Sequence, residues 1–80
     1  MNAGSIKKAV ELYSLDELMK AEDALLNEQL PEIEIEGSDE GEKLTHVLAA
    51  IFCKHEMQHS GLNLNQAIRL YSQRVRNSIN

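Results

Sequence analysis

Apolar side chains recur at helical spacing through most of the chain, and polar residues at fixed offsets mark where helices begin and end. In the stretch SIKKAVELY, Ile6, Val10 and Tyr13 fall on one face of a helix. Ser5 is the predicted N-cap, because its hydroxyl can accept a hydrogen bond from a backbone N–H of the first turn. The first element is therefore predicted to be a short amphipathic helix.

A second helix begins after Ser14, where the Ser-x-x-Glu spacing of Ser14 and Glu17 predicts a capping box. Pro31 ends this helix near Gln29, because proline disfavours helical backbone at the residue before it. The predicted apolar stripe consists of Leu15, Leu18, Met19, Leu25 and Leu26. The pattern leaves open whether the first two helices are separate or continuous through a kink.

The longest helix is predicted from about residue 39 to residue 60, with Ser38 as its N-cap and acids in the first turn, where the helix dipole favours them. Gly61 ends it. Asn63 and Gln66 form a second capping box at the start of the last helix. One face of that helix carries the apolar residues Leu64, Ala67, Ile68, Tyr71 and Val75.

Residues 32–36, EIEIE, alternate polar and apolar side chains with the period of a strand. A single five-residue strand has no partner in an otherwise helical chain. We interpret the segment as an extended linker in which Ile33 and Ile35 fill gaps between helices. The alternative is that it pairs with its own copy across a dimer axis.

Together these elements predict an all-α fold: a bundle of three to four helices, with an extended acidic linker between the second and third, in a single domain over residues 1–80. Aromatic residues are scarce, so the core is built from aliphatic side chains. A chain of this length buries a small core, and ordering each residue costs roughly 1.5 kcal/mol. Cys53 is the single cysteine and cannot form an intrachain disulfide. Oligomerisation is therefore the expected supplement to stability.

The third helix presents two apolar sides on a helical wheel. We predict that the larger one packs against the chain's own helices; it comprises Leu44, Val47, Leu48, Ile51 and Phe52. The opposite side is predicted to form a homodimer interface, because its residues carry few charges and include small side chains: His46, Ala50, Cys53 and Met57. The alternative is that this second side packs against the first or last helix of the same chain.

Charge is distributed unevenly along the chain. Glu56 is the one acid outside residues 11–42, so that range holds twelve of the thirteen acids, with Lys20 as its single base. After Gly61 there is no acid and there are three arginines: Arg69, Arg74 and Arg76. The net charge of −5 and the absence of stacking aromatics argue against nucleic acid. We expect the arginines to serve protein–protein electrostatics.

The stretch HEMQH has the His-Glu-x-x-His spelling of a zinc-protease helix, with His55 and His59 as ligands and Glu56 as general base. A catalytic zinc site needs a third protein ligand, and no His, Asp, Glu or Cys follows His59. His46 lies nine residues before His55 and hence on the opposite side of the helix. The pair is interpreted as the polar end of a packed face. Metal binding by His55 and His59 is the alternative.

No continuous apolar segment follows the N-terminal lysines, and no apolar run approaches the roughly 20 residues of a membrane helix. We therefore expect a cytoplasmic protein that does not engage a membrane. No glycine-rich phosphate loop, nucleophile triad or paired-carboxylate site is recognisable. No cofactor and no catalytic function are predicted.

A set of residues in the last third of the chain has a recognisable order: His55, Gly61, Asn63, Ala67-Ile68, Tyr71, Arg74-Val75 and Ser78-Ile79. In these residues the chain resembles a family of short bacterial proteins of unknown function. The resemblance implies a small all-α fold and implies no activity. From the sequence we expect a structural or protein-interaction module that associates with itself as a homodimer; a metal-binding protein or zinc-dependent hydrolase is the alternative.

Overall fold

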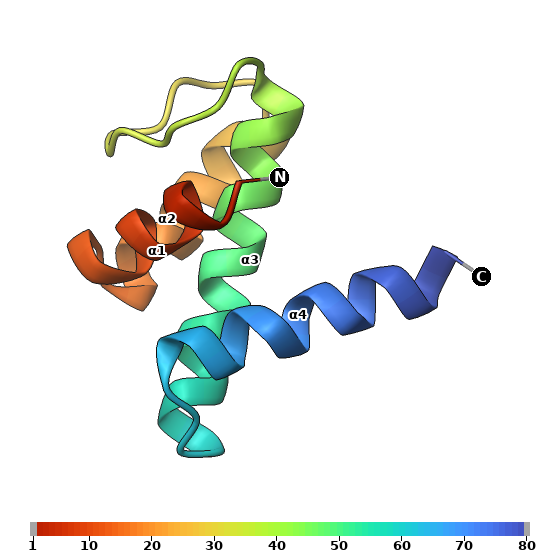
Figure 1. Cartoon of the computed structure of the whole chain (residues 1–80). Helices are drawn as coiled ribbons and strands as arrows, with labels where there is room; N and C mark the ends of the chain where they lie inside the picture. The colour runs from red at the N-terminus through yellow and green to blue at the C-terminus, as the bar shows by residue number, and fades with distance from the viewer. Residues whose placement is uncertain (1, 80) are drawn as a thin grey trace.

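The computed structural model describes residues 2–79, and within them the chain folds into helices joined by a turn, a long linker and a short loop (Figure 1). The helices are α1 (Ala3–Leu12), α2 (Leu15–Leu26), α3 (Glu40–His59) and α4 (Leu64–Ile79). The described residues contain no strand. The predicted all-α bundle is confirmed.

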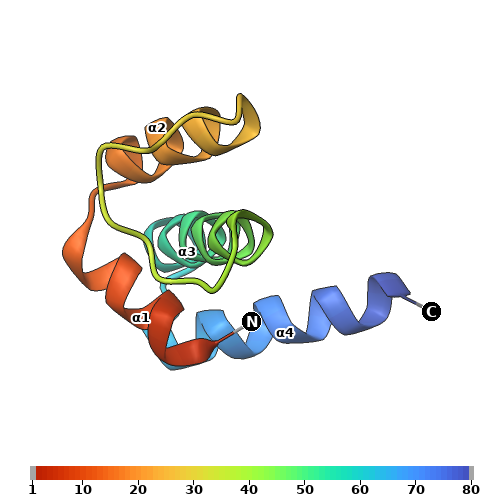
Figure 2. The ribbon, with the colours of Figure 1, turned by 90° about the horizontal axis from the view of Figure 1, so that it is seen from above.

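Helix α3 is the centre of the fold and contacts each of the other three helices. Seen nearly along its axis, α2 and α4 lie on opposite sides of it and α1 closes a third side (Figure 2). The fourth side has no helix, and the C-terminal half of α4 extends beyond the body formed by the other helices. This arrangement determines which face of α3 is covered and which is left open.

Local capping explains where the first two helices begin. The N-cap of α1 is Asn2, whose side-chain oxygen accepts hydrogen bonds from the backbone N–H groups of Gly4 (2.8 Å) and Ser5 (3.4 Å). The prediction that Ser5 is this cap was wrong, because Asn2 supplies the acceptor earlier in the chain. The capping box of Ser14 and Glu17 is present in full. Because Ser14 is extended, α1 and α2 are separate helices.

The ends of the longer helices follow the same local rules. Asp39 rather than Ser38 is the N-cap of α3, and its carboxylate accepts from the backbone N–H of Glu42 at 2.8 Å. Gly61 has φ +69°, the left-handed conformation that follows many helices and that glycine adopts without strain. Asn63 and Gln66 exchange side-chain to backbone hydrogen bonds of 2.8 and 2.9 Å, which confirms the second predicted capping box.

The linker, residues 27–39, is fixed by hydrogen bonds and by one buried side chain. The Glu36 carboxylate accepts from the Ser5 hydroxyl at 2.9 Å and from the Lys8 ammonium at 2.7 Å. Ile35 is buried in the core. The segment 32–36 therefore behaves as the linker that the sequence predicts, with its apolar residues packed among helices.

The most buried side of α3 differs from the one predicted, although Val47 is buried and Leu44, Ile51 and Phe52 do pack against the core. Of the five residues assigned to the inner face, Val47 is fully buried, whereas Leu48 is 40% exposed and the others are half-buried. Complete burial is found at Ala49, Ala50 and Cys53. The prediction failed because it ranked faces by the size of their apolar side chains. In the fold, small side chains face the neighbouring helices and allow close approach.

His46 is the one histidine in this buried face, and both of its ring nitrogens are engaged. Nδ1 lies 2.7 Å from the carbonyl oxygen of Glu36, and Nε2 accepts from the backbone N–H of Asn2 at 3.0 Å. Because a carbonyl can only accept, the ring is the neutral tautomer with its proton on Nδ1. One imidazole thus joins α3 to the segment before α1 and to the linker.

We predict that His46→Ala destabilises the protein by about 2–4 kcal/mol, because it leaves a cavity and removes the partners of two backbone groups. Urea denaturation followed by circular dichroism measures the change. The matched control is His55→Ala, at an exposed position on the same helix, which we expect to change stability by less than about 0.5 kcal/mol. Equal stability of the two variants would contradict the structural role of His46.

Acid should weaken the contact between the linker and α1. Hydrogen bonds from Lys8 and then from Ser5 hold the pKa of Glu36 below its ordinary value. A lowered folded-state pKa stabilises the protein above the unfolded pKa of about 4.3, and that contribution is lost as pH falls through the folded value. We therefore expect Glu36→Gln to lose less stability than the wild type between about pH 6 and pH 3. Urea midpoints at the two pH values test this, and identical losses would refute it. Lys8→Met should act in the same direction.

Candidate interaction surface

The surface of this small fold exposes several large apolar side chains. They are Leu12 (62%), Met19 (52%), Leu26 (62%), Leu30 (89%) and Leu48 (40%). Single exposed apolar residues are ordinary in soluble proteins. Exposed apolar residues that share one face of a helix can form a larger patch.

Met19 and Leu26 share one face of α2. They are seven residues apart, which places them about 20° from each other around the helix axis. Leu18 and Leu25 form a parallel pair about 100° away and are buried against the core. Helix α2 therefore carries two apolar stripes, one covered by the chain and one exposed.

On α3, the side opposite the buried small residues carries Leu44, Leu48 and Phe52 at successive turns. Phe52 is the residue on this side of α3 that contacts α4. Its ring lies 5.4 Å, between centroids, from that of Tyr71, and the Arg74 guanidinium lies 5.3 Å from the ring centroid. Leu48 has no such cover. We call the exposed side chains Met19, Leu26 and Leu48 the apolar surface.

The three arginines of α4 do not form one strip. Arg74 lies over Phe52, whereas Arg69 and Arg76 are exposed and, seven residues apart, share the outer face of the helix. Within residues 2–79 no ion pair joins any of the three to an acid. A shallow hollow of about 320 Å³ beside Arg69 is lined by Leu62, Gln66, Leu70 and Gln73 as well.

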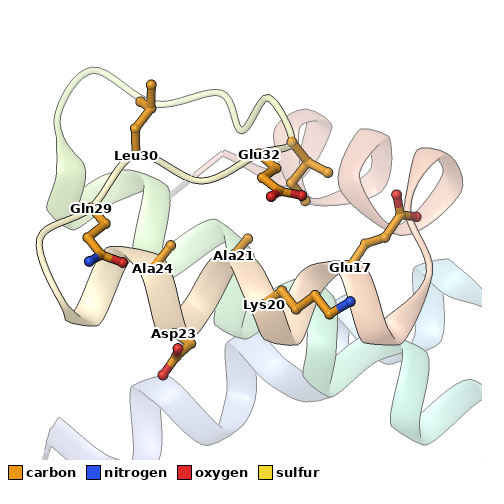
Figure 3. A pocket seen from close by; sticks show the side chains of 9 residues that line it. Glu17, Lys20, Ala21, Asp23, Ala24, Gln29, Leu30 and Glu32 are labelled. Carbon is orange, nitrogen blue, oxygen red and sulfur yellow. The ribbon is translucent and has the colours of Figure 1, made fainter.

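A pocket of about 610 Å³ lies between α2 and the linker (Figure 3). Ala21 and Ala24 point from α2 toward the linker, whereas Asp23 points away from it. Two of the four charged residues in its lining, Glu17 and Lys20, make contacts at or within α2. Glu17 accepts from the backbone N–H of Ser14 at 2.9 Å, and Lys20 pairs with Asp16 outside the pocket at 3.2 Å. No set of groups converges there to perform chemistry.

The residues predicted to form a dimer interface lie inside the chain. His46, Ala50 and Cys53 are at most 1% exposed, and Met57 is half-buried. This matches the alternative in which the band packs against the chain's own helices. Burial raises the pKa of the Cys53 thiol to about 11, so the thiol is protonated at neutral pH and unreactive. Any association has to use another face.

His55 and His59 are exposed near the end of α3, with ring centroids 4.3 Å apart. Glu56 accepts a hydrogen bond from the Ser60 hydroxyl at 2.6 Å rather than facing the pair. Among the described residues no group of three or more His, Cys, Asp or Glu side chains is placed to hold a metal ion. The two histidines that the alternative named as metal ligands are thus close together but lack a third ligand.

Sequence reasoning placed Met19, Leu26 and Leu48 in the core, although they are the exposed apolar residues. A signal for the first two was present: Leu18/Leu25 and Met19/Leu26 are adjacent stripes, and one helix face cannot bury both. For Leu48 no such signal existed, because the deciding fact is where α1, α2 and α4 lie around α3.

A model for a family of unknown function, DUF6952, matches residues 1–80. The chain belongs to this family. The match confirms that the chain belongs to a family of unknown function, and the helices of the structure confirm the helical fold that the resemblance implied. No curated protein and no solved structure matched the chain. No helix among residues 2–79 combines the length and the apolar character that crossing a membrane requires.

We predict that the isolated protein retains no stoichiometric zinc after dialysis, because two imidazoles leave half of a tetrahedral shell to water. Elemental analysis of protein purified without an affinity tag measures this. One zinc per chain, lost when His55 and His59 are both changed to Ala, would overturn the interpretation. Half a zinc per chain would indicate a site shared between two copies.

Proposed function

We propose that this member of the DUF6952 family is a protein-interaction module that self-associates, and that it does so through the apolar surface of α2 and α3. The observation that carries the proposal is the exposure of Met19 and Leu26 as one stripe of α2, and of Leu48 on the side of α3 opposite its buried residues. Exposed apolar residues that share a face mark interaction sites.

The composition of the core supports the proposal. Among the residues that the structure describes, twelve buried apolar residues form the core, and six of them are alanine or cysteine: Ala9, Ala21, Ala49, Ala50, Cys53 and Ala67. These residues bury little area each, while larger leucine and methionine side chains remain outside. Covering the latter in an interface adds apolar burial at roughly 25 cal/mol per Å².

The solvent-accessible surface area of the chain also supports an interface. A compact monomer of 9.0 kDa is expected to expose roughly 4,900 Å² from the scaling of surface with mass. This chain exposes 5286 Å². The excess accords with the extended end of α4 (Figure 1). An interface of standard size removes about 800 Å² per partner, which this surface can supply.

Electrostatics favour a protein partner over nucleic acid. The net charge is −5, and of the three arginines Arg74 is engaged with Phe52. The two that remain, Arg69 and Arg76, are too few to counter the repulsion between an acidic protein and a phosphate backbone. No observation in the described residues favours the alternative of a zinc-dependent hydrolase, since His55 and His59 lack a third ligand.

We predict a wild type of about twice 9.0 kDa by light scattering, and a monomer for Leu48→Glu. The side chain at 48 is partly exposed, so a glutamate there reaches solvent in the monomer but is buried in the dimer, where an unpaired charge is costly. Circular dichroism checks that the variant stays helical.

The matched control is Gln58→Glu, which adds the same charge at an exposed position of α3 outside the apolar surface. We expect it to remain dimeric. A wild type that is monomeric at every concentration tested would refute the proposal, and so would a Leu48→Glu variant that associates as the wild type does.

A further inference from the structure

We propose that the C-terminal half of α4 is an exchanged arm: in the dimer, the arm of each copy lies beside α3 of the other copy and covers Leu48. The arm is defined as residues 72–79. This inference rests on the proposed function, because it names the segment of the second copy that meets the apolar surface at Leu48.

The side of α3 without a helix suits a helix from another molecule. Helices α2 and α4 pack against α3 from opposite sides, so α3 occupies the layer between them (Figure 2). Packed helices have axes about 8–10 Å apart. A further helix laid in the layer of α3, on its fourth side, therefore lies at ordinary packing distance from α3.

Leu48 lies next to the point at which α4 leaves α3. Phe52 follows Leu48 by four residues and is about 40° from it around the helix axis. The Phe52 ring is 5.4 Å from the Tyr71 ring, between centroids, and its centroid is 5.3 Å from the Arg74 guanidinium. Both of these partners lie midway along α4. Leu48, which is 40% exposed, is therefore at the base of the arm.

The arm continues the apolar face of α4 past the body of the fold (Figures 1 and 2). Val75 follows Tyr71 by four residues and so lies on the same face. Among the described residues, the half-buried apolar side chains that pack on the core include Tyr71 but not Val75. A short helical segment is marginal in water unless its apolar face is packed. A second copy supplies that packing.

Two-fold symmetry lets both arms dock at once. When the axis lies beside α3 and nearly parallel to it, the two arms run antiparallel with their apolar faces toward each other. Residues 72–79 span about 12 Å at 1.5 Å per residue, so two arms that overlap along their length bring each tip to α3 of the other copy. The same surface is then used by both copies, as a two-fold interface requires.

Charge favours the arm of a second copy as the occupant of this position. Helix α4 has no acid, whereas α2 carries four acids and one lysine. An arm in the layer of α3 lies beside α2 of the other copy, so a basic helix approaches an acidic one. Within one chain α3 separates α2 from α4, and this attraction is not used (Figure 2).

Disulfide trapping between two variants tests the contact. One protein carries Leu48→Cys and the other carries Ser78→Cys, an exposed position near the tip of the arm. Cys53 does not compete, because it is fully buried and its pKa of about 11 keeps the thiol protonated. After oxidation of an equimolar mixture, we expect a covalent heterodimer at least tenfold more abundant than the homodimer of either variant. Symmetry places the two copies of each position at opposite ends of the paired arms. Mass spectrometry identifies the linked peptides.

The matched control replaces Leu48→Cys by Gln58→Cys, at an exposed position of α3 outside the contact. It should give no heterodimer above the homodimer level. Equal cross-linking from positions 48 and 58, or none from position 48, would overturn the arm exchange.

A second measurement keeps Leu48 unchanged. We expect Val75→Glu to raise the dimer dissociation constant at least tenfold in sedimentation equilibrium, because the added charge is buried between the arms. Asn65→Glu, at an exposed position of α4 before the arm, should leave the constant unchanged. Circular dichroism checks that both variants stay helical. If Val75→Glu dimerises normally while Leu48→Glu does not, the self-association stands and the arm contact is refuted. A monomeric wild type refutes both.

Discussion

The fold depends on how α3 meets three helices at once. Its buried face consists of small residues at the points of closest approach, with Ala49, Ala50 and Cys53 fully covered. Small side chains let helix axes come close, so α1, α2 and α4 can all reach the same twenty-residue helix. The consequence is that the larger residues of α3 lie at the edges of the contacts or outside them. Leu48 is the clearest case, because it belongs to the central helix and is still 40% exposed.

His46 adds a polar element to this packing. It fixes the linker and the segment before α1 through two backbone groups, those of Glu36 and Asn2. Glu36 is used twice, since its carboxylate also holds Ser5 and Lys8 on α1. Buried polar groups that are fully hydrogen-bonded define one arrangement of the chain, because any other arrangement leaves them unpaired. The linker is therefore a structural part of the domain despite its acidic composition and lack of regular structure.

The sequence predicts those features that depend on residues near one another in the chain. The capping boxes at Ser14 and Asn63, the helix end at Gly61 and the linker at 32–36 are all of this kind. It does not predict which face of α3 is buried, because that face is selected by α1, α2 and α4 and not by the hydrophobicity of α3 alone. The role of His46 was missed for the same reason, since its partner Asn2 lies 44 residues away. The candidate surface was missed as well. The sequence analysis assigned Met19, Leu26 and Leu48 to packed apolar faces, whereas in the structure these side chains are exposed.

Stability and association are linked by the same choice of residues. A core in which half the apolar members are alanine or cysteine leaves a small margin against the entropy of folding. The leucine and methionine side chains that could widen this margin lie exposed on α2 and on the side of α3 opposite its buried residues. A partner that binds the folded chain alone shifts the folding equilibrium toward it. For this chain, the proposed self-association would therefore bury apolar side chains that the three helices around α3 leave exposed.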